Sequence, residues 1–526
     1  MKFLSGTHRQ RQNAFFSKHP AYVAPESIAF DVYYDDFEVA NPLGPKAGTH
    51  KIAIFYYRLK SLLSLFNSSM EIIHLLAIGY TNDFKRYSYK AVLNKIAEEF
   101  ISLESKGIEV ETENDTVRFF PFLGTFSGDN LGLHTIFGFF ESFSANKVCL
   151  FCMGDKSDFQ SNQVKCCKYY FELQNFNNKN GHLVNSNVSQ TDCPLNRTSW
   201  NVATNNSADI MHDLFEGYGQ FCTKYVLRQL ILDGFFTVDQ FYDRVNNFPY
   251  GNTDSKNRPV AVSKEILLSL EGHTLKQKAL PFWCLFRLLP QLIRKFVLPG
   301  NSHWALFLEF KEIVDFLLCQ KWTKDLGEVY KNKYASHLRK FKDLFPHIPL
   351  TPKSHFLIHY STVAEYSGPP YKLMVAPQEL KGNWFKRYSG VMCNYKKVPV
   401  SFASKHQYQA LQNILQNKLW KYNVSIEKTE NRLTENIPKE MEPFIENFST
   451  TSATVATKLI VCGQMYLAGD ILALYIDLAT GYPIFWKIIF ASSLNNNYTK
   501  TAIFYKKWTQ FVLKHTCTVI PLNVLG

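Results

Sequence analysis

The pattern of hydrophobic and polar residues predicts strands and helices in the first third of the chain. Residues 89–103 repeat their apolar positions about every 3.6 residues, which predicts a helix, and a second helix is expected over 131–143. Four segments rich in aromatic and β-branched side chains are typical of strands: 30–34, 52–57, 72–78 and 117–125. The predicted order is therefore strand, strand, strand, helix, strand, helix.

The middle of the chain is mostly helical after an irregular stretch. Residues 149–200 are rich in Asn, Cys and Lys and lack hydrophobic periodicity, so this stretch has little core of its own. A helix is predicted over 209–232, where Ser207 can cap the first turn. Amphipathic helices with a basic bias are predicted over most of 263–344, and helices return over 355–416.

The two ends of the chain differ from these regions. Residues 1–29 are polar and basic without periodicity, which predicts an arm. The segment 425–454 is acidic and contains prolines, so we interpret it as a linker. From 455 to 526, short alternating segments predict a small β domain. The whole pattern predicts an α/β protein.

Composition places the chain among globular proteins. Its 526 residues are 46% hydrophobic and 20% charged, which excludes a wholly disordered, collagen-like or coiled-coil protein. No apolar run approaches the roughly 18–20 residues of a membrane span, and residues 1–17 lack the apolar region of a secretory signal. We therefore expect a soluble intracellular protein with no membrane partner. The net charge of +13 permits binding to nucleic-acid phosphates, although many enzymes that bind no nucleic acid are equally basic.

Two aspartates at the ends of predicted strands form the first candidate site. Asp35 follows the first strand and Asp129 follows the fourth. Sites that cleave phosphodiesters with two divalent cations need carboxylates on rigid neighbouring elements, because the cations sit about 3.5–4 Å apart. Adjacent strands in a ribonuclease H-like sheet would bring the two carboxylates together. The alternative, which spacing alone favours, is that both are ordinary turn residues.

Cysteines form the second candidate site. Cys149 and Cys152 have the CxxC spacing that can hold one tetrahedral Zn²⁺ from a single tight turn. A structural zinc site needs two more ligands. The available candidates, whose spacing fits no standard zinc finger, are Cys166, Cys167, His182 and Cys193. The alternative is a group of buried free thiols; in a reducing compartment we do not expect a disulfide framework.

Two further groups have helical spacing. Asp209, His212 and Glu216 lie at i, i+3 and i+7, so they would share one face of a helix, where His and Glu can bind a metal together. We favour a solvated polar face as the interpretation. His355 and His359 repeat the i, i+4 spacing, and the simplest interpretation is a half-buried helix whose histidines are hydrogen-bonded.

Glu379 begins a basic segment. Lys381, Lys386 and Arg387 follow it closely, so the carboxylate could complete a metal site while the cations hold DNA phosphates. A surface ion-pair cluster is the alternative. No local feature of the sequence decides between the two.

Taken in order, these strings resemble the motifs of the CACTA (En/Spm-type) transposases, most closely their animal branch. The match runs over roughly 30–421, including the long gap before the last acid. The strings that carry it are Asp35-Asp-Phe-Glu-Val-Ala-Asn-Pro-Leu-Gly, Gly128-Asp129-Asn-Leu-Gly-Leu-His, Cys149-x-x-Cys152, Asp209-Ile-Met-His212, Phe356-Leu-Ile-His359, Gly368-Pro-Pro and Gln-Glu379-Leu-Lys.

The resemblance implies a ribonuclease H-like catalytic core with Asp35, Asp129 and Glu379 as its metal-binding triad. Two Mg²⁺ or Mn²⁺ ions would activate water to cut one strand at the element end, and then the freed 3′-hydroxyl for transfer. Cys149 and Cys152 would hold a structural Zn²⁺, and His212 would be an ancillary residue near the site. The implied partners are transposon ends, target DNA and further copies of the chain, in the nucleus.

The resemblance and the residue patterns together predict a division of the chain into six segments. The core would be interrupted by a large, mostly helical insertion with a zinc knuckle, and the third acid would lie after that insertion. The predicted segments are a basic arm (1–29), the first part of the core (30–148), the insertion (149–344), the core completion (345–424), a linker (425–454) and a small β domain (455–526).

Two departures from the family pattern leave other functions open. Family members usually carry a DNA-binding region before the core, where only about thirty residues precede it here, and Gly382 stands where the animal proteins often carry His. One alternative is a domesticated, non-catalytic derivative that binds DNA or protein. The other is a metal-dependent nuclease unrelated to transposons.

Overall fold

The structure is a computed structural model that divides into two compact units, Met1–Leu63 with Asn67–Gln412, and Ser64–Phe66 with Asn413–Gly526. Each unit is considered by itself. In the first unit and at its end, the described residues are 26–39, 48–60, 70–111, 115–139, 149–152, 154, 156–160, 193–202, 205, 207–251, 254–319, 321–392 and 396–416; in the second unit they are the strands given below.

The first unit contains a five-stranded mixed sheet with the order β3-β2-β1-β5-β4. Neighbouring strands are antiparallel except for β1 and β5, which are parallel. The strands are β1 (Ser27–Glu38), β2 (Lys51–Leu59), β3 (His74–Tyr80), β4 (Ile108–Glu111) and β5 (Thr116–Gly128). The four predicted strands are thus confirmed, whereas the short β4 was not predicted.

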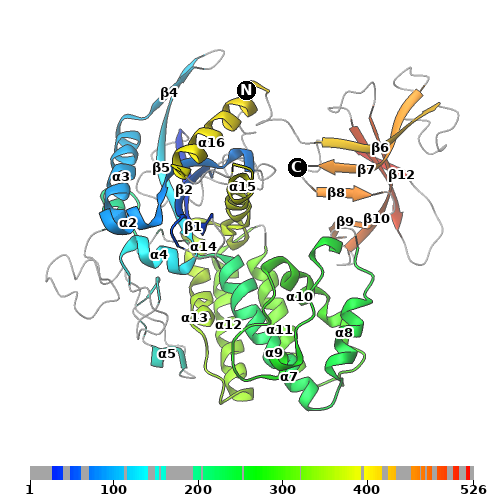
Figure 1. Ribbon diagram of the computed structural model, residues 1–526. Helices are drawn as coiled ribbons and strands as arrows, with labels where there is room; N and C mark the ends of the chain where they lie inside the picture. The colour runs from blue at the N-terminus through cyan, green and yellow to red at the C-terminus, as the bar shows by residue number, and fades with distance from the viewer. Residues whose placement is uncertain are drawn as a thin grey trace. The chain divides into compact units, whose positions relative to one another are not determined.

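Side chains along β1 alternate between the two faces of the sheet, as the period of a strand requires. Phe30 and Tyr34 contact Phe100 and Tyr89 of helix α3 (Tyr89–Lys106). On the other face, Tyr33 hydrogen-bonds to Glu379 of helix α15 (Ala376–Met392). In Figure 1, α3 and α15 lie on opposite sides of these strands. The alternation therefore puts the odd-numbered Asp35 on the face that α15 covers.

Three other helices complete the packing around this sheet. α4 (Asn130–Phe137) follows β5 and ends before Gly138, whose φ of 75° is favourable for glycine. The helix predicted over 131–143 is therefore shorter. The others are α2 (Thr81–Tyr87) and α16 (Val398–Leu415). Short elements of this unit are η2 (Met70–Ile72), α5 (Lys156–Gln160), η3 (Pro194–Arg197), η5 (Ser255–Asn257) and η7 (Pro370–Leu373).

The helical region predicted between the second and third acids is confirmed. Its buried core is largely aromatic: the ring of Tyr218 contacts those of Phe310, Tyr334 and Phe341. The elements are η4 (Met211–Tyr218), which is a π-helix, α7 (Gly219–Leu232), α8 (Val238–Asn246), α9 (Lys264–Leu268), α10 (Ala279–Ile293), α11 (Ser302–Leu317), α12 (Lys324–Leu344), α13 (Pro352–Phe356), η6 (Leu357–His359) and α14 (Tyr360–Ser367). None of the helices that the structure describes has the length and apolar character needed to cross a membrane.

In the described part of the second unit, seven strands form an antiparallel sheet. Five follow the order β12-β11-β10-β7-β6, while β8 pairs with β7 and β9 with β10. They are β6 (Val424–Leu433), β7 (Ser452–Val461), β8 (Gln464–Leu467), β9 (Ile471–Ile476), β10 (Pro483–Ser493), β11 (Thr501–Trp508) and β12 (Cys517–Pro521). Because β6 covers the start of the predicted linker 425–454 and β7 begins before its end, those parts of the linker prediction are wrong. Of the predicted arm, 1–25 lie outside the described residues, and Ser27 already begins β1.

Candidate metal centres

Asp35 lies in the middle of a group of acids. It belongs to β1 itself, opposite Ile54 of β2, and does not follow the strand as predicted. Burial, and then the charges of Glu379 and Asp129, raise the pKa of Asp35 well above its usual range. Those charge effects mean that the three carboxylates lie close together. We call Asp35, Asp129 and Glu379 the carboxylate cluster.

Asp129 reaches this cluster because β5 is parallel to β1. Their register sets Tyr34 beside Gly128, so the next residues are Asp35, still on β1, and Asp129, directly after the end of β5. Asp129 is the N-cap of α4 and accepts a hydrogen bond from the Gly132 backbone at 2.5 Å. A Cβ at Gly132 would lie 2.6 Å from the Asp129 carboxylate, so this turn needs glycine there.

Glu379 comes from the first turn of α15. Its Oε1 accepts a hydrogen bond of 2.8 Å from the Tyr33 hydroxyl, which ties the helix to β1. One turn later, Gly382 faces Asp35: a Cβ there would lie 3.5 Å from the Asp35 Oδ2. A larger side chain at 382 would therefore reach the carboxylate cluster. This is the position where the family resemblance leads us to expect a histidine.

A buried ion cluster anchors the segment that leads into α15. Arg58 Nε lies 3.3 Å from Asp31 Oδ2, and Lys60 Nζ lies 3.3 Å from the other oxygen of Asp31. Arg58 also donates to the Lys372 carbonyl at 3.2 Å. Since Lys372 lies in η7, just before α15, this contact helps to set the position of Glu379.

His212 adds a positive charge beside the carboxylate cluster. Its Nδ1 is hydrogen-bonded to Asp209, and its Nε2 lies 3.9 Å from Glu379 Oε1 and 4.0 Å from Glu216 Oε2. Burial lowers the pKa of His212, but the Asp209 hydrogen bond and the charges of Asp209, Glu379 and Glu216 outweigh it and raise the pKa to about 9. The interpretation as a solvated polar face is wrong, because Asp209 is buried and His212 half-buried.

The backbone around His212 is unusual. Residues 211–218 form a π-helix, a rare form that is frequent at functional sites. Gly217 has non-helical angles (φ −123°, ψ −116°), and a Cβ on it would lie 2.6 Å from the Lys353 side chain and 2.9 Å from the His212 carbonyl. Lys353 Nζ donates to that same carbonyl at 2.8 Å. Lysine and glycine together therefore hold the irregular turn.

A second group of potential ligands joins the two ends of the helical region. The ligand atoms of Cys149, Cys152, His355 and His359 all lie within 4.8 Å of one another, and all four residues are buried. We call them the Cys₂His₂ cluster. His355 Nε2 lies 3.1 Å from Cys152 Sγ and 3.1 Å from His359 Nε2.

Backbone groups stabilise the sulfur atoms of this cluster. The amide of Phe151 donates to Cys149 Sγ and that of Gly154 to Cys152 Sγ, each at 3.3 Å. The two amides therefore fix the positions of the sulfur atoms. Burial and the charge of His355 lower the pKa of His359 well below its usual range, so its imidazole is neutral. Two cysteine sulfurs and two imidazoles are the ligand set that commonly holds Zn²⁺.

His355 and His359 were not predicted from the sequence to be ligands of the same site as Cys149 and Cys152. His355 is 203 residues from Cys152, and the predicted interpretation of the pair was hydrogen bonding within a helix. Of the residues proposed as the remaining ligands, Cys193 is buried but is not one of the four, and Cys166, Cys167 and His182 lie outside the described residues. The useful signal was the i, i+4 spacing of two histidines in an otherwise apolar segment.

The basic residues near the candidate sites divide into two kinds. In the helical region, Lys333 pairs with Glu312 at 3.0 Å and Lys340 with Glu309 at 2.8 Å, so part of the basic bias is neutralised locally. Lys381 is buried and donates to the Met70 carbonyl. Lys386, by contrast, is exposed, and its charge lowers the pKa of Asp35. It is the better-placed cation for a phosphate bound at the carboxylate cluster.

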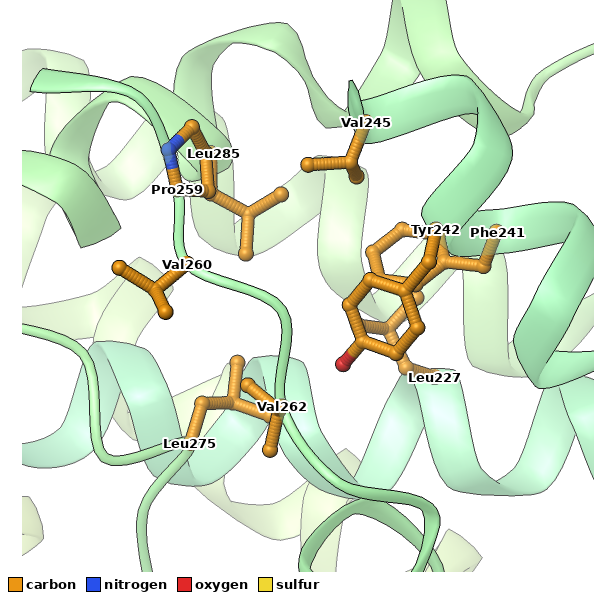
Figure 2. A pocket seen from close by; sticks show the side chains of 9 residues that line it. All are labelled: Leu227, Phe241, Tyr242, Val245, Pro259, Val260, Val262, Leu275 and Leu285. Atoms are coloured by element: carbon orange, nitrogen blue, oxygen red, sulfur yellow. The ribbon is translucent and has the colours of Figure 1, made fainter. Parts of the chain in front are cut away.

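An apolar pocket in the helical region offers no comparable chemistry. Figure 2 shows its lining, in which the Tyr242 hydroxyl is the single polar side-chain group. The lining residues are Leu227, Phe241, Tyr242, Val245, Pro259, Val260, Val262, Leu275 and Leu285. With no acid, base or metal ligand there, the carboxylate and Cys₂His₂ clusters are the stronger candidates.

Comparison with known proteins adds no constraint to these sites. A scan against protein-family models found no match to the chain, and a search of the curated proteins found none.

Proposed function

We propose that the chain is a transposase-like protein of the CACTA type, whose carboxylate cluster cleaves and joins DNA strands with two divalent metal ions. The observation that carries the proposal is the convergence of Asp35, Asp129 and Glu379 from β1, the end of β5 and α15. These are the residues that the family resemblance implies as the catalytic triad. Their distance in sequence makes a chance meeting on one sheet face a weak alternative.

The topology around the cluster supports a ribonuclease H-like core. Three antiparallel strands, β3-β2-β1, are extended by the parallel β5 after the crossover helix α3. The first acid lies near the end of β1, and the second lies directly after the parallel strand β5. Two carboxylates at neighbouring strand ends could share the metal ions of one site.

The electrostatics favour a divalent cation in the cluster. Burial, and then the like charges of Glu379 and Asp129, raise the pKa of Asp35, and a bound cation would oppose this by favouring the ionised form. Carboxylate oxygens are the ligands that Mg²⁺ and Mn²⁺ prefer. When bound, two such ions would supply activation of water, or of a 3′-hydroxyl, and stabilisation of the leaving oxygen.

The protein's own residues would position the reactants. Tyr33 holds Glu379 by its hydroxyl, and the N-cap hydrogen bond from Gly132 holds Asp129. Lys386 would contact a phosphate of the bound strand. His212 carries a proton at neutral pH and faces Glu379, so it would balance negative charge between the carboxylates and the DNA.

The Cys₂His₂ cluster would hold a structural Zn²⁺. It joins residues that precede the helical region to α13 and η6 at its end, so the metal would close the insertion at its base. The partners we propose are transposon-end and target DNA, bound by a homo-oligomer in the nucleus.

Calorimetric titration with Mn²⁺ tests the proposal. We expect binding by the wild type and loss of binding in Asp35→Asn/Asp129→Asn. Asp36→Asn is a matched control, since Asp36 is the next residue on β1 but pairs with Lys51 at 2.7 Å. Asp129→Asn should also abolish Mn²⁺-dependent nicking while leaving DNA binding intact or stronger.

The outcomes separate the proposed function from its alternatives. Nicking that survives Asp129→Asn would place the active site elsewhere. Nicking without strand-transfer products would favour a nuclease unrelated to transposons. A folded wild type that binds DNA, but does not bind Mn²⁺ and does not cut DNA, would favour the domesticated, non-catalytic derivative. The glycine at 382 is the observation that motivates this alternative.

A further inference from the structure

Asp213 lies between the two candidate metal centres. Its side chain is buried, with 1% of the residue exposed, and accepts two hydrogen bonds. One comes from Asn130 Nδ2 at 2.6 Å and the other from the Tyr360 hydroxyl at 3.1 Å. Asn130 directly follows Asp129 of the carboxylate cluster, and Tyr360 directly follows His359 of the Cys₂His₂ cluster.

The placement of this carboxylate needs an explanation. Burying an acid costs free energy, and here burial raises the pKa of Asp213 to about 6, although Lys353 and the hydrogen bonds act against this effect. An apolar residue at the same place would avoid the cost. The acid instead joins three elements that carry functional candidates: η4 with His212, α4 with Asp129 at its N-cap, and α14 next to His359.

We propose that Asp213 is a positioning residue through which the Cys₂His₂ cluster controls metal binding at the carboxylate cluster. With a metal bound, His359 would be fixed at the start of α14, and so would the Tyr360 hydroxyl next to it. That hydroxyl orients Asp213, which in turn holds Asn130 and the first turn of α4, where Asp129 is the cap. Because coupling free energies are reciprocal, each metal then strengthens the binding of the other. This inference rests on the proposed function.

The test measures coupling in the full-length chain. Co²⁺ is the probe for the Cys₂His₂ cluster, since cobalt–thiolate absorption reports its occupancy, and Mn²⁺ is the probe for the carboxylates, followed by electron paramagnetic resonance. We expect Mn²⁺ to bind about 5- to 50-fold more tightly to Co²⁺-loaded wild type than to Cys149→Ser/Cys152→Ser. In Co²⁺-loaded Tyr360→Phe, which loses only one hydroxyl, this gain should fall below about twofold.

Controls separate positioning from general loss of structure. Tyr366→Phe changes an exposed tyrosine of the same helix and should keep the full gain. Asn130→Ala interrupts the path at its other end and should lose the gain as Tyr360→Phe does. In both path variants the Co²⁺ absorption spectrum and the Co²⁺ stoichiometry should match those of the wild type.

Two results would overturn the inference, and they differ in what else they affect. Mn²⁺ binding that is equally tight with and without Co²⁺, or a full gain in both path variants, contradicts the coupling but leaves the carboxylate site standing. Failure of the wild type to bind Mn²⁺ at all, with Co²⁺ bound, contradicts the proposed function and this inference with it.

Discussion

The carboxylate cluster and the Cys₂His₂ cluster belong to one compact unit, yet the histidines at the two places have pKa values shifted in opposite directions. His212 lies beside the carboxylates, and His359 belongs to the Cys₂His₂ cluster. Beside the carboxylates, the pKa of His212 is raised to about 9 because Asp209, Glu379 and Glu216 outweigh the effect of burial. In the other cluster, burial and His355 lower the pKa of His359 well below its usual range. One imidazole is thus a cation at neutral pH and the other a neutral ligand.

This difference separates the two candidate metal sites in kind. The Cys₂His₂ cluster is buried and brings together two distant segments, so a metal there would act on folding. The carboxylate cluster keeps unbalanced negative charge at a partly accessible place, which suits a metal that must meet a substrate. The following changes should therefore affect the two clusters in different ways.

The largest effect is expected from removal of the Cys₂His₂ ligands. Cys149→Ser/Cys152→Ser should lower the free energy of unfolding of the metal-loaded protein by about 5 kcal/mol or more, because structural metal binding is folding free energy. Thermal unfolding followed by circular dichroism, with and without chelator, measures the change. A chelator that leaves the wild-type transition unmoved would contradict a structural metal.

The next effect is a shift in the titration of His212. Asp209→Asn should lower the pKa of His212 from about 9 toward the ordinary value of about 6.5, by more than one pH unit. Since the folded pKa is raised, the associated stabilisation is complete below about pH 6.5 and is lost as the pH rises through about 9. Imidazole resonances in metal-free protein report both values. An unchanged pKa would mean that Asp209 is not its main partner.

A smaller effect of opposite sign to the cysteine change is expected at Asp35. In metal-free protein Asp35→Asn should raise the free energy of unfolding at pH 7 by about 1–2 kcal/mol, because it removes the cost of burying a carboxylate and its repulsion from Glu379 and Asp129. The raised pKa of Asp35 means that this gain is absent well below pH 3.8 and grows as the pH rises toward the folded pKa. Denaturant unfolding at several pH values measures it. Destabilisation by Asp35→Asn at pH 7 would contradict the like-charge cluster.

The smallest effect is expected from Tyr33→Phe. Loss of the hydrogen bond to Glu379 should weaken Mn²⁺ binding by about 1 kcal/mol, or roughly fivefold, without changing the occupancy of the Cys₂His₂ cluster. Titration with Mn²⁺ in parallel with Co²⁺ absorption separates the two sites. Equal losses at both sites would indicate a general loosening of the unit.

Local sequence patterns were sufficient to predict those helices and strands whose own residues carry the pattern. Runs of aromatic and β-branched residues predict β1, β2, β3 and β5, and the period of 3.6 predicts α3 and the helices after residue 263, because each depends on neighbours along the chain. The charged β6 shows the limit of this approach. It is at the edge of its sheet, where charged side chains are tolerated, and therefore looks like a linker in sequence.

The identity of both clusters' candidate residues could be read from the chain: three acids, a CxxC and an HxxxH are all present in order. Their grouping could not. The parallel register of β1 and β5 sets Asp35 beside Asp129, the return of α15 adds Glu379, and the closure of the helical region joins Cys152 to His355 across 203 residues. These pairings depend on packing between distant segments, for which periodicity along the chain carries no information.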